Sequence, residues 1–280
     1  MINFNSTSIG YSHIIKNKPC QDFSAVFCSA AANIICVADG HGADAYFRSA
    51  KGSRFAAEVA LVAVREFVLR FLPFKNRSSD DINFQITQLE KCIISRWGDK
   101  VYEDFLYFPF SEEEMAKIPP ADDYEEMIYS TYGTTLLCCA VTENYWFAFQ
   151  IGDGKIAALS KGGGWNEPVP WDDRCFLNAT TSICDHDAIS EFRHYYSEDI
   201  PAAVFLCTDG ASDSYAKPED LYKLYERILT IKPLDETHII NWLQNLLPKL
   251  SEAGSGDDIS IAGIINEKDV KTALNPHINV

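Results

Sequence analysis

The sequence has few positively charged residues for its size. Among 280 residues there are 24 lysines and arginines against 40 aspartates and glutamates, a formal net charge of −16. Nucleic acids and anionic membrane surfaces bind clustered lysine and arginine, so we expect the chain to bind neither. No apolar stretch is long enough to cross a bilayer, and residues 1–19 lack the basic start and apolar stretch of a signal peptide.

The sequence also lacks two common functional motifs. None of the nine cysteines forms a C-x-x-C pair, which argues against a zinc ribbon or a thioredoxin-like site. No Lys-Ser or Lys-Thr follows the glycines of KGGGW, residues 161–165, which excludes a Walker-type phosphate loop. Cys36, Cys138, Cys139 and Cys207 lie inside apolar runs, where a thiol packs as a small hydrophobic group. We therefore expect a reduced, cytoplasmic protein.

The 47 % hydrophobic and 12 % aromatic content is enough to bury a core, and we expect one domain over residues 1–280. Pattern and length predict strands over 22–28, 33–38, 133–141, 144–152, 155–160, 202–210 and 258–265. They predict helices over 54–72, 81–106, 218–230 and 236–250. We expect a meander of antiparallel strands from residue 133, and sheets that pack together under paired helices. A surface insertion near 108–128 and a flap-like loop near 161–200 complete the prediction.

Three of the apolar strands run into the same dipeptide. Residues 33–42 read NIICVADGHG, and the pairs Asp153-Gly154 and Asp209-Gly210 also follow apolar runs. A single Asp-Gly is most simply a turn, but three turns of one design favour a shared role. Asp22 and the pair Asp257-Asp258 stand at the starts of further strands.

Carboxylates that meet at one edge of a sheet repel one another unless something neutralises them. A hard divalent cation such as Mg²⁺ or Mn²⁺ does so, because it prefers oxygen ligands and needs only a few carboxylates beside its waters. The glycine after each aspartate lets the backbone approach the ion closely, since no Cβ intervenes. The pattern therefore predicts a divalent metal centre.

The order of the motifs QD, DGHG, YGTT, GDG, TDGASD and GDDIS resembles the metal-dependent protein phosphatases, the PPM or type 2C family, in its bacterial single-domain form. The resemblance spans residues 22–261. It implies an α+β fold, a four-layer αββα sandwich of two antiparallel sheets flanked by helix pairs. It also implies hydrolysis of phosphoserine and phosphothreonine in proteins by a metal-activated water, with two Mn²⁺ or Mg²⁺ ions, positions that can hold a third, and no covalent intermediate.

The same resemblance assigns roles to individual residues. Asp39 would bridge both metals, the carbonyl of Gly40 would bind one of them, and His41 would protonate the leaving oxygen. Asp209 and Asp257 would bind the other ion directly. Asp22 would hold metal-bound water, and Asp153 and Asp213 would hold a third ion. Gly133, Thr134 and Thr135 of YGTT would support the centre.

The sequence departs from the family at the substrate phosphate. The family has an arginine before its first acidic pair, whereas HIIKNKPCQD contains none, so His13, Lys16 or Lys18 would replace it. Gln21 replaces a common glutamate, and Asp258 replaces the usual asparagine. An active phosphatase acting on a phosphorylated protein is favoured because Asp39, Asp209 and Asp257 are all present. The alternatives are a catalytically silent binding or regulatory module of the same fold and a small-molecule phosphohydrolase. The oligomeric state is undetermined.

Overall fold

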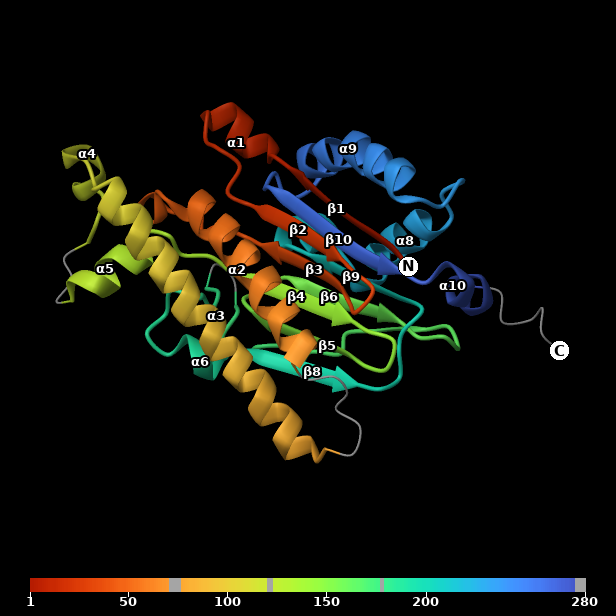
Figure 1. Ribbon diagram of the computed structural model, residues 1–280. Coiled ribbons are helices and arrows are strands. Elements are labelled where there is room, and N and C mark those ends of the chain that lie inside the picture. The colour runs from red at the N-terminus through yellow and green to blue at the C-terminus, as the bar shows by residue number, and fades with distance from the viewer. Residues whose placement is uncertain (71–76, 120–122, 177–178, 275–280) are drawn as a thin grey trace.

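Two five-stranded antiparallel sheets pack face to face in the computed structural model, which describes residues 1–70, 77–119, 123–176 and 179–274 (Figure 1). The first sheet has the order β1 (Ile2–Ser8), β10 (Ile259–Ile265), β9 (Ala203–Cys207), β6 (Lys155–Leu159) and β7 (Trp165–Asn166). The second has the order β2 (Phe23–Cys28), β3 (Asn33–Ala38), β4 (Leu136–Val141), β5 (Trp146–Ile151) and β8 (Arg193–Ser197).

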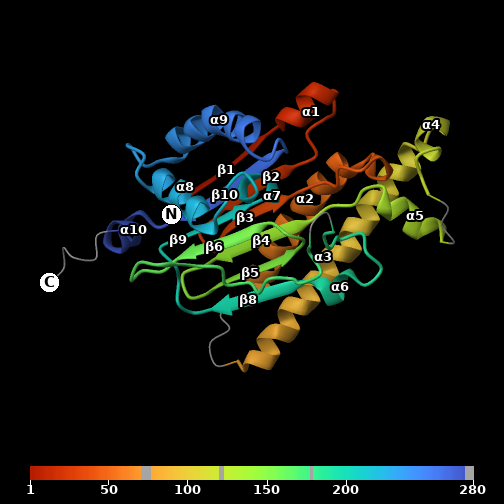
Figure 2. The same ribbon diagram turned by 180° about the vertical axis from the view of Figure 1, so that it is seen from behind.

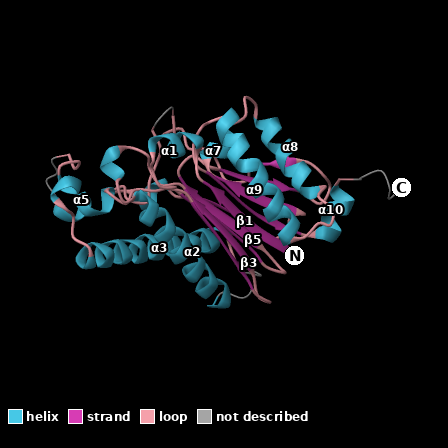
Figure 3. Ribbon diagram, turned by 90° about the horizontal axis from the view of Figure 1, so that it is seen from above, coloured by secondary structure: helices cyan, strands magenta, loops and turns pink. Residues whose placement is uncertain are grey.

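A pair of long helices covers the outer face of each sheet. Helices α2 (Ser49–Arg70) and α3 (Ser79–Tyr107) cover the second sheet, and α8 (Pro218–Leu229) and α9 (Glu236–Ala253) cover the first (Figures 1 and 3). The shorter elements are α1 (Tyr11–Lys16), the 3₁₀ helix η1 (Asp44–Tyr46), α4 (Glu112–Met115), α5 (Tyr124–Ser130), α6 (Ala188–Glu191), α7 (Asp209–Ser212) and α10 (Glu267–Ala273). The predicted four-layer sandwich is confirmed.

The packing of strand β3 explains why its sequence is apolar after Asn33. Successive side chains of a strand point to opposite faces. Ile34 and Cys36 pack into the core under α2 and α3, while Ile35 and Val37 pack into the core between the sheets. A strand that is buried on both faces needs an unbroken apolar run, and this strand carries the chain directly to Asp39.

Helix α2 begins at Ser49, five residues before the predicted start, and packs tightly on the chain that leads to YGTT. A Cβ added at Gly52 would collide with the carbonyl oxygen of Tyr132. The indole Nε1 of Trp97 in α3 donates to the Gly52 carbonyl at 3.1 Å and so joins the two helices. The predicted end of this helix, residues 71 and 72, lies outside the described residues. The helix predicted over 81–106 extends to 79–107.

Three strands, β1, β7 and β8, were missed, and β6 was assigned to the wrong neighbours. Strand β1 precedes the strand that we expected to be first, and β8 lies within the segment expected to be a flap-like loop. The expected meander holds for β4 and β5, but β6 pairs with β9 and β7 of the other sheet. The chain crosses between sheets at Gly152, which has a φ of +101° that only glycine adopts readily.

The acidic insertion is fixed to the body of the protein by one arginine. Arg48, which is 8 % exposed, contacts both carboxylate oxygens of Glu114 at 3.1 Å and donates to the carbonyl of Phe108 at 2.7 Å and to the hydroxyl of Tyr132 at 2.8 Å. Helix α4 is therefore held beside the loop that follows His41. Within the described residues, no helix combines the length and apolarity that a membrane span requires.

Candidate metal centre

The aspartates that follow the apolar strands meet in one cavity of about 670 Å³. They come from the ends of β3, β5 and β9 and from the loop before β10; Figure 2 shows α7, the short helix that starts at Asp209 after β9. Six of the predicted functional residues line the cavity: Asp39, His41, Asp153, Asp209, Asp213 and Asp257.

The backbone around Asp39 is fixed by the YGTT segment. The amide of Asp39 donates to Thr135 Oγ1 at 3.0 Å, and its carbonyl accepts from the Thr135 amide and the Thr134 hydroxyl, both at 2.8 Å. A Cβ on Gly40 would lie 2.7 Å from the carbonyl oxygens of Gln21 and Ser49, so no larger residue fits there without a shift. The glycine is thus required by close approach of three chain segments.

Asp22 lies buried below the cavity, 6 % exposed. Its Oδ2 accepts a hydrogen bond from the Thr208 hydroxyl at 2.8 Å, which links the start of β2 to the end of β9. Its Oδ1 and the Oδ1 of Asp209 are buried without a hydrogen-bond partner in the described part of the chain. Two such orphaned carboxylate oxygens are costly to leave unsatisfied and are the donors that a hard cation binds.

Electrostatic repulsion adds to this cost. Burial, and then the charges of Asp22, Asp209 and Asp257, raise the pKa of Asp39 well above its usual value. Burial and the charge of Asp258 raise the pKa of Asp22. Burial is also the main cause that raises the pKa of Asp209 to about 6. Without a bound ion these carboxylates are therefore costly to ionise, and a bound divalent cation would neutralise their mutual repulsion.

Asp153 and Asp213 also line the cavity. Burial raises the pKa of Asp153, and the charge of Asp213 adds to the effect. Arg193 lies close enough to oppose the shift, and its Nη2 donates to the carbonyl of Gly152 at 2.6 Å. The charges of both aspartates also raise the pKa of Asp209, so they belong to the same group of carboxylates.

Hydrogen bonds to the backbone of His41 fix its position. Its amide donates to the carbonyl of Gly133 at 3.1 Å, and its carbonyl accepts from Gln21 Nε2 at 2.8 Å and from the hydroxyl of Ser49 at 2.9 Å. The ring packs edge-on against Tyr46, with centroids 4.8 Å apart. Burial lowers the pKa of His41 to about 4, so in the metal-free protein the ring is neutral at neutral pH.

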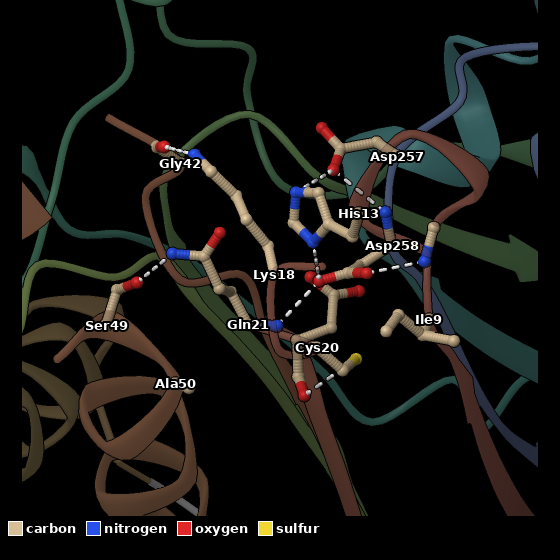
Figure 4. Close-up of polar contacts among 12 residues, drawn as sticks. Ile9, His13, Lys18, Cys20, Gln21, Gly42, Ser49, Ala50, Asp257 and Asp258 are labelled. Carbon is tan, nitrogen blue, oxygen red and sulfur yellow. Dashed lines mark hydrogen bonds and ion pairs between the residues drawn. The ribbon is translucent and has the colours of Figure 1, made fainter. Parts of the chain in front are cut away.

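The three cations predicted near the substrate phosphate lie in different places. Lys18 reaches the cavity rim, where its Nζ donates to the carbonyl of Gly42 at 3.0 Å and lies 3.8 Å from a carboxylate oxygen of Asp44 (Figure 4). Lys16 is exposed in the last turn of α1. His13 is buried and faces Asp257 and Asp258.

Sequence reasoning missed three lining residues with polar side chains: Tyr46, Thr180 and Ser255. Ser255 lies two residues before Asp257, and its hydroxyl accepts from the Asp257 amide at 3.2 Å. A serine shortly before an aspartate in a glycine-rich loop is a pattern that can be recognised in the sequence, so Ser255 could have been predicted. Tyr46 and Thr180 stand in segments without a recognisable motif.

The fold is found in solved bacterial phosphatases. The catalytic domain of the serine/threonine protein phosphatase PstP, in complex with two manganese ions, has a TM-score of 0.55 at 14 % identity, over 94 % of this chain and 98 % of that one. The S. agalactiae serine/threonine phosphatase has a TM-score of 0.56 at 17 % identity, over 94 % of this chain and 99 % of that one. PppA, a regulatory component of T6SS in Pseudomonas aeruginosa, has a TM-score of 0.55 at 15 % identity, over 94 % and 96 %.

These likenesses define the class of fold, a sandwich shared with solved phosphatases. The family model described as Protein phosphatase 2C matches residues 9–248. The chain belongs to the protein phosphatase 2C family. No curated protein matches its sequence.

Proposed function

We propose that the protein is a Mn²⁺- or Mg²⁺-dependent phosphatase that hydrolyses phosphoserine and phosphothreonine in proteins. The observation that carries the proposal is the set of carboxylates around one open cavity, two of which keep buried oxygens without a hydrogen-bond partner in the described part of the chain. Family membership and a homologous fold that contains two manganese ions support it.

The residues present fit a pair of divalent cations. Asp39, the carbonyl of Gly40, Asp209 and Asp257 would hold the ions, and Asp22 would support them from below. When bound, the two ions neutralise phosphoryl oxygens and lower the pKa of water so that it attacks phosphorus at neutral pH. Asp153 and Asp213 would hold a third, weaker ion.

The chain's own residues would orient and protonate the substrate. Lys18, at the rim, is the cation placed to contact a phosphate, as a point charge without the fork of an arginine. His41 lines the cavity and would donate its proton to the departing serine or threonine oxygen. A bound phosphate dianion raises the pKa of a neighbouring imidazole, which offsets the lowering by burial.

All nine cysteines are free thiols. Free thiols persist in a reducing compartment, and on this ground we place the enzyme in the cytoplasm, where phosphorylated proteins are available as substrates. The net charge of −16 supports a protein substrate over a nucleic acid.

The test is phosphate release from a phosphothreonine peptide, with Mn²⁺ or with a chelator, by the wild type and by Asp209→Asn. We expect release that requires Mn²⁺ and is lost in the variant. Asp235→Asn is the matched control, because Asp235 caps α9 away from the cavity. Mn²⁺ binding without release from any phosphopeptide would contradict the proposal and favour a silent binding module. Faster release from a small phosphorylated molecule would favour the small-molecule phosphohydrolase.

A further inference from the structure

A buried histidine stands beside the predicted metal ligand Asp257. His13 lies on α1 and is 7 % exposed. Its Nδ1 is 3.0 Å from Asp258 Oδ2, and its Nε2 is 3.6 Å from Asp257 Oδ1 (Figure 4). Both ring nitrogens therefore face carboxylates, and the ring is not part of the cavity lining among the described residues.

Asp258 anchors the ring. It is 2 % exposed, and its two carboxylate oxygens accept hydrogen bonds of 2.6 Å from the amides of Gly10 and Gln21. A carboxylate buried this deeply is stable only with charged or hydrogen-bonding partners on both oxygens. The resemblance places an asparagine at this position, whereas here the residue is a carboxylate that faces a histidine.

Asp257 depends on polar contacts for its orientation, because its side chain is 51 % exposed. Its Oδ1 accepts from the amide of Asp258 at 2.8 Å and faces the imidazole. The hydroxyl of Ser251 donates to the Asp257 carbonyl at 2.8 Å, which fixes the backbone. Oδ2 makes no hydrogen bond within the described part of the chain, and it is the oxygen left to bind a cation.

Helix α1 brings the histidine to this loop through backbone contacts. The amide of Ser12 donates to the carbonyl of Gly256 at 2.8 Å, and the amide of Tyr11 donates to the Ser251 hydroxyl at 2.9 Å. A Cβ on Gly10 would lie 2.4 to 2.8 Å from the backbone between Asp257 and Asp258, so α1 begins in direct contact with the loop. The short helix thus packs against the loop that presents Asp257.

We propose that His13 is a positioning residue for the metal centre: Asp258 holds its ring, and the ring holds the Asp257 carboxylate in the orientation that binds the ion. His13 then does not bind the substrate phosphate. The inference rests on the proposed function, because it takes Asp257 as a metal ligand. Partners that orient metal ligands typically contribute 10- to 100-fold to metal affinity.

The test is the dissociation constant of Mn²⁺, measured by titration calorimetry without substrate. Three variants separate the contacts of His13 with Asp258 and Asp257. His13→Ala removes both contacts, His13→Asn keeps an amide near the position of Nδ1, and His13→Gln keeps an amide near the position of Nε2. We expect His13→Ala to weaken Mn²⁺ binding about 10-fold or more. We expect His13→Gln to bind more tightly than His13→Asn, because it preserves the contact with Asp257. KM for the phosphopeptide at saturating Mn²⁺ should not change.

His194→Gln is the matched control. His194 on β8 forms a buried pair with Glu90 on α3, with Nδ1 2.9 Å from Oε1 and side chains 18 % and 2 % exposed. Losing this pair should lower the melting temperature of the metal-free protein and leave Mn²⁺ affinity unchanged. A purely structural role of His13 would give the same result as this control. If His13→Ala does not fold, the Gln and Asn variants still decide the question.

The outcomes separate the two proposals. Unchanged Mn²⁺ affinity in the His13 variants overturns the positioning role, and unchanged affinity with a raised KM assigns His13 to the substrate phosphate instead. Wild-type protein that binds Mn²⁺ but releases no phosphate overturns the proposed function, while the comparison of affinities still decides the role of His13. Wild-type protein that binds no Mn²⁺ overturns both.

Discussion

Replacing Asp209 by asparagine should stabilise the metal-free protein while abolishing hydrolysis. The pKa of Asp209 rises from 3.8 to about 6, first because of burial and then because of neighbouring carboxylates. At about 1.4 kcal/mol for each factor of ten in acidity, keeping this group ionised at neutral pH costs the folded state at most about 3 kcal/mol. The neutral amide of Asp209→Asn avoids that cost.

The pH dependence gives the sign of the effect. A carboxyl whose pKa is higher in the folded than in the unfolded state binds its proton more tightly when folded, so wild-type stability falls as the pH rises from about 4 to about 6. Above about pH 6 the group is ionised in both states and the full cost is present. The advantage of Asp209→Asn should therefore be largest at neutral pH and vanish below about pH 4.

The assay is thermal unfolding in a chelator at pH 7.5 and at pH 4. At about 2–4 °C for each kcal/mol, the variant should melt a few degrees above the wild type at pH 7.5. Adding Mn²⁺ should increase the free energy of unfolding of the wild type only, by about 2.7 kcal/mol at a Mn²⁺ concentration a hundred times the dissociation constant. A variant less stable than the wild type in the chelator at pH 7.5, or a difference that does not change with pH, would refute the reasoning.

Three other substitutions test separate parts of the structure. Lys18→Met should raise KM for a phosphopeptide and leave Mn²⁺ affinity unchanged, as steady-state kinetics and calorimetry would show; an unchanged KM places the phosphate elsewhere. Gly52→Ala should lower the melting temperature, because a collision with the Tyr132 carbonyl outweighs a gain of about 1 kcal/mol in helix propensity. Gly98→Ala, whose Cβ would meet no atom closer than 3.7 Å, should not lower it, and equal losses in both would contradict the packing argument. Arg48→Met should lower the free energy of unfolding by about 2–3 kcal/mol and speed amide hydrogen exchange in residues 108–115. Unchanged exchange would show that the arginine does not hold the insertion.

The site residues that could be predicted from the sequence lie within contiguous motifs. Apolar strands that end in Asp-Gly placed Asp39, Asp153 and Asp209 correctly on one cavity, because a strand buried on both faces has a recognisable sequence and a definite end. The order of the motifs then gave the two-sheet sandwich.

The rest depends on contacts between distant segments. Strand β1 reads INFNSTS, and its polar residues conceal the alternation of Ile2 and Phe4 that marks a strand. The crossing of β6 to the other sheet is set by the conformation at Gly152. His13 is one of three candidate phosphate contacts in the sequence because it lies shortly before Asp22, whereas its neighbours in space, Asp257 and Asp258, lie some 240 residues later. No local pattern reports such a pairing.

The order of the strands has a consequence for how the protein is made. Among the strands of the described residues, β1 lies at the edge of its sheet and pairs only with β10, which is the last of these strands to leave the ribosome. Asp257, just before β10, is synthesised long after Asp22 and Asp39. A nascent chain that has not reached β10 therefore lacks the partner of β1 and one of the carboxylates proposed to bind metal. In the proposed enzyme, metal binding would then require synthesis through β10, so chains truncated before β10 would be inactive.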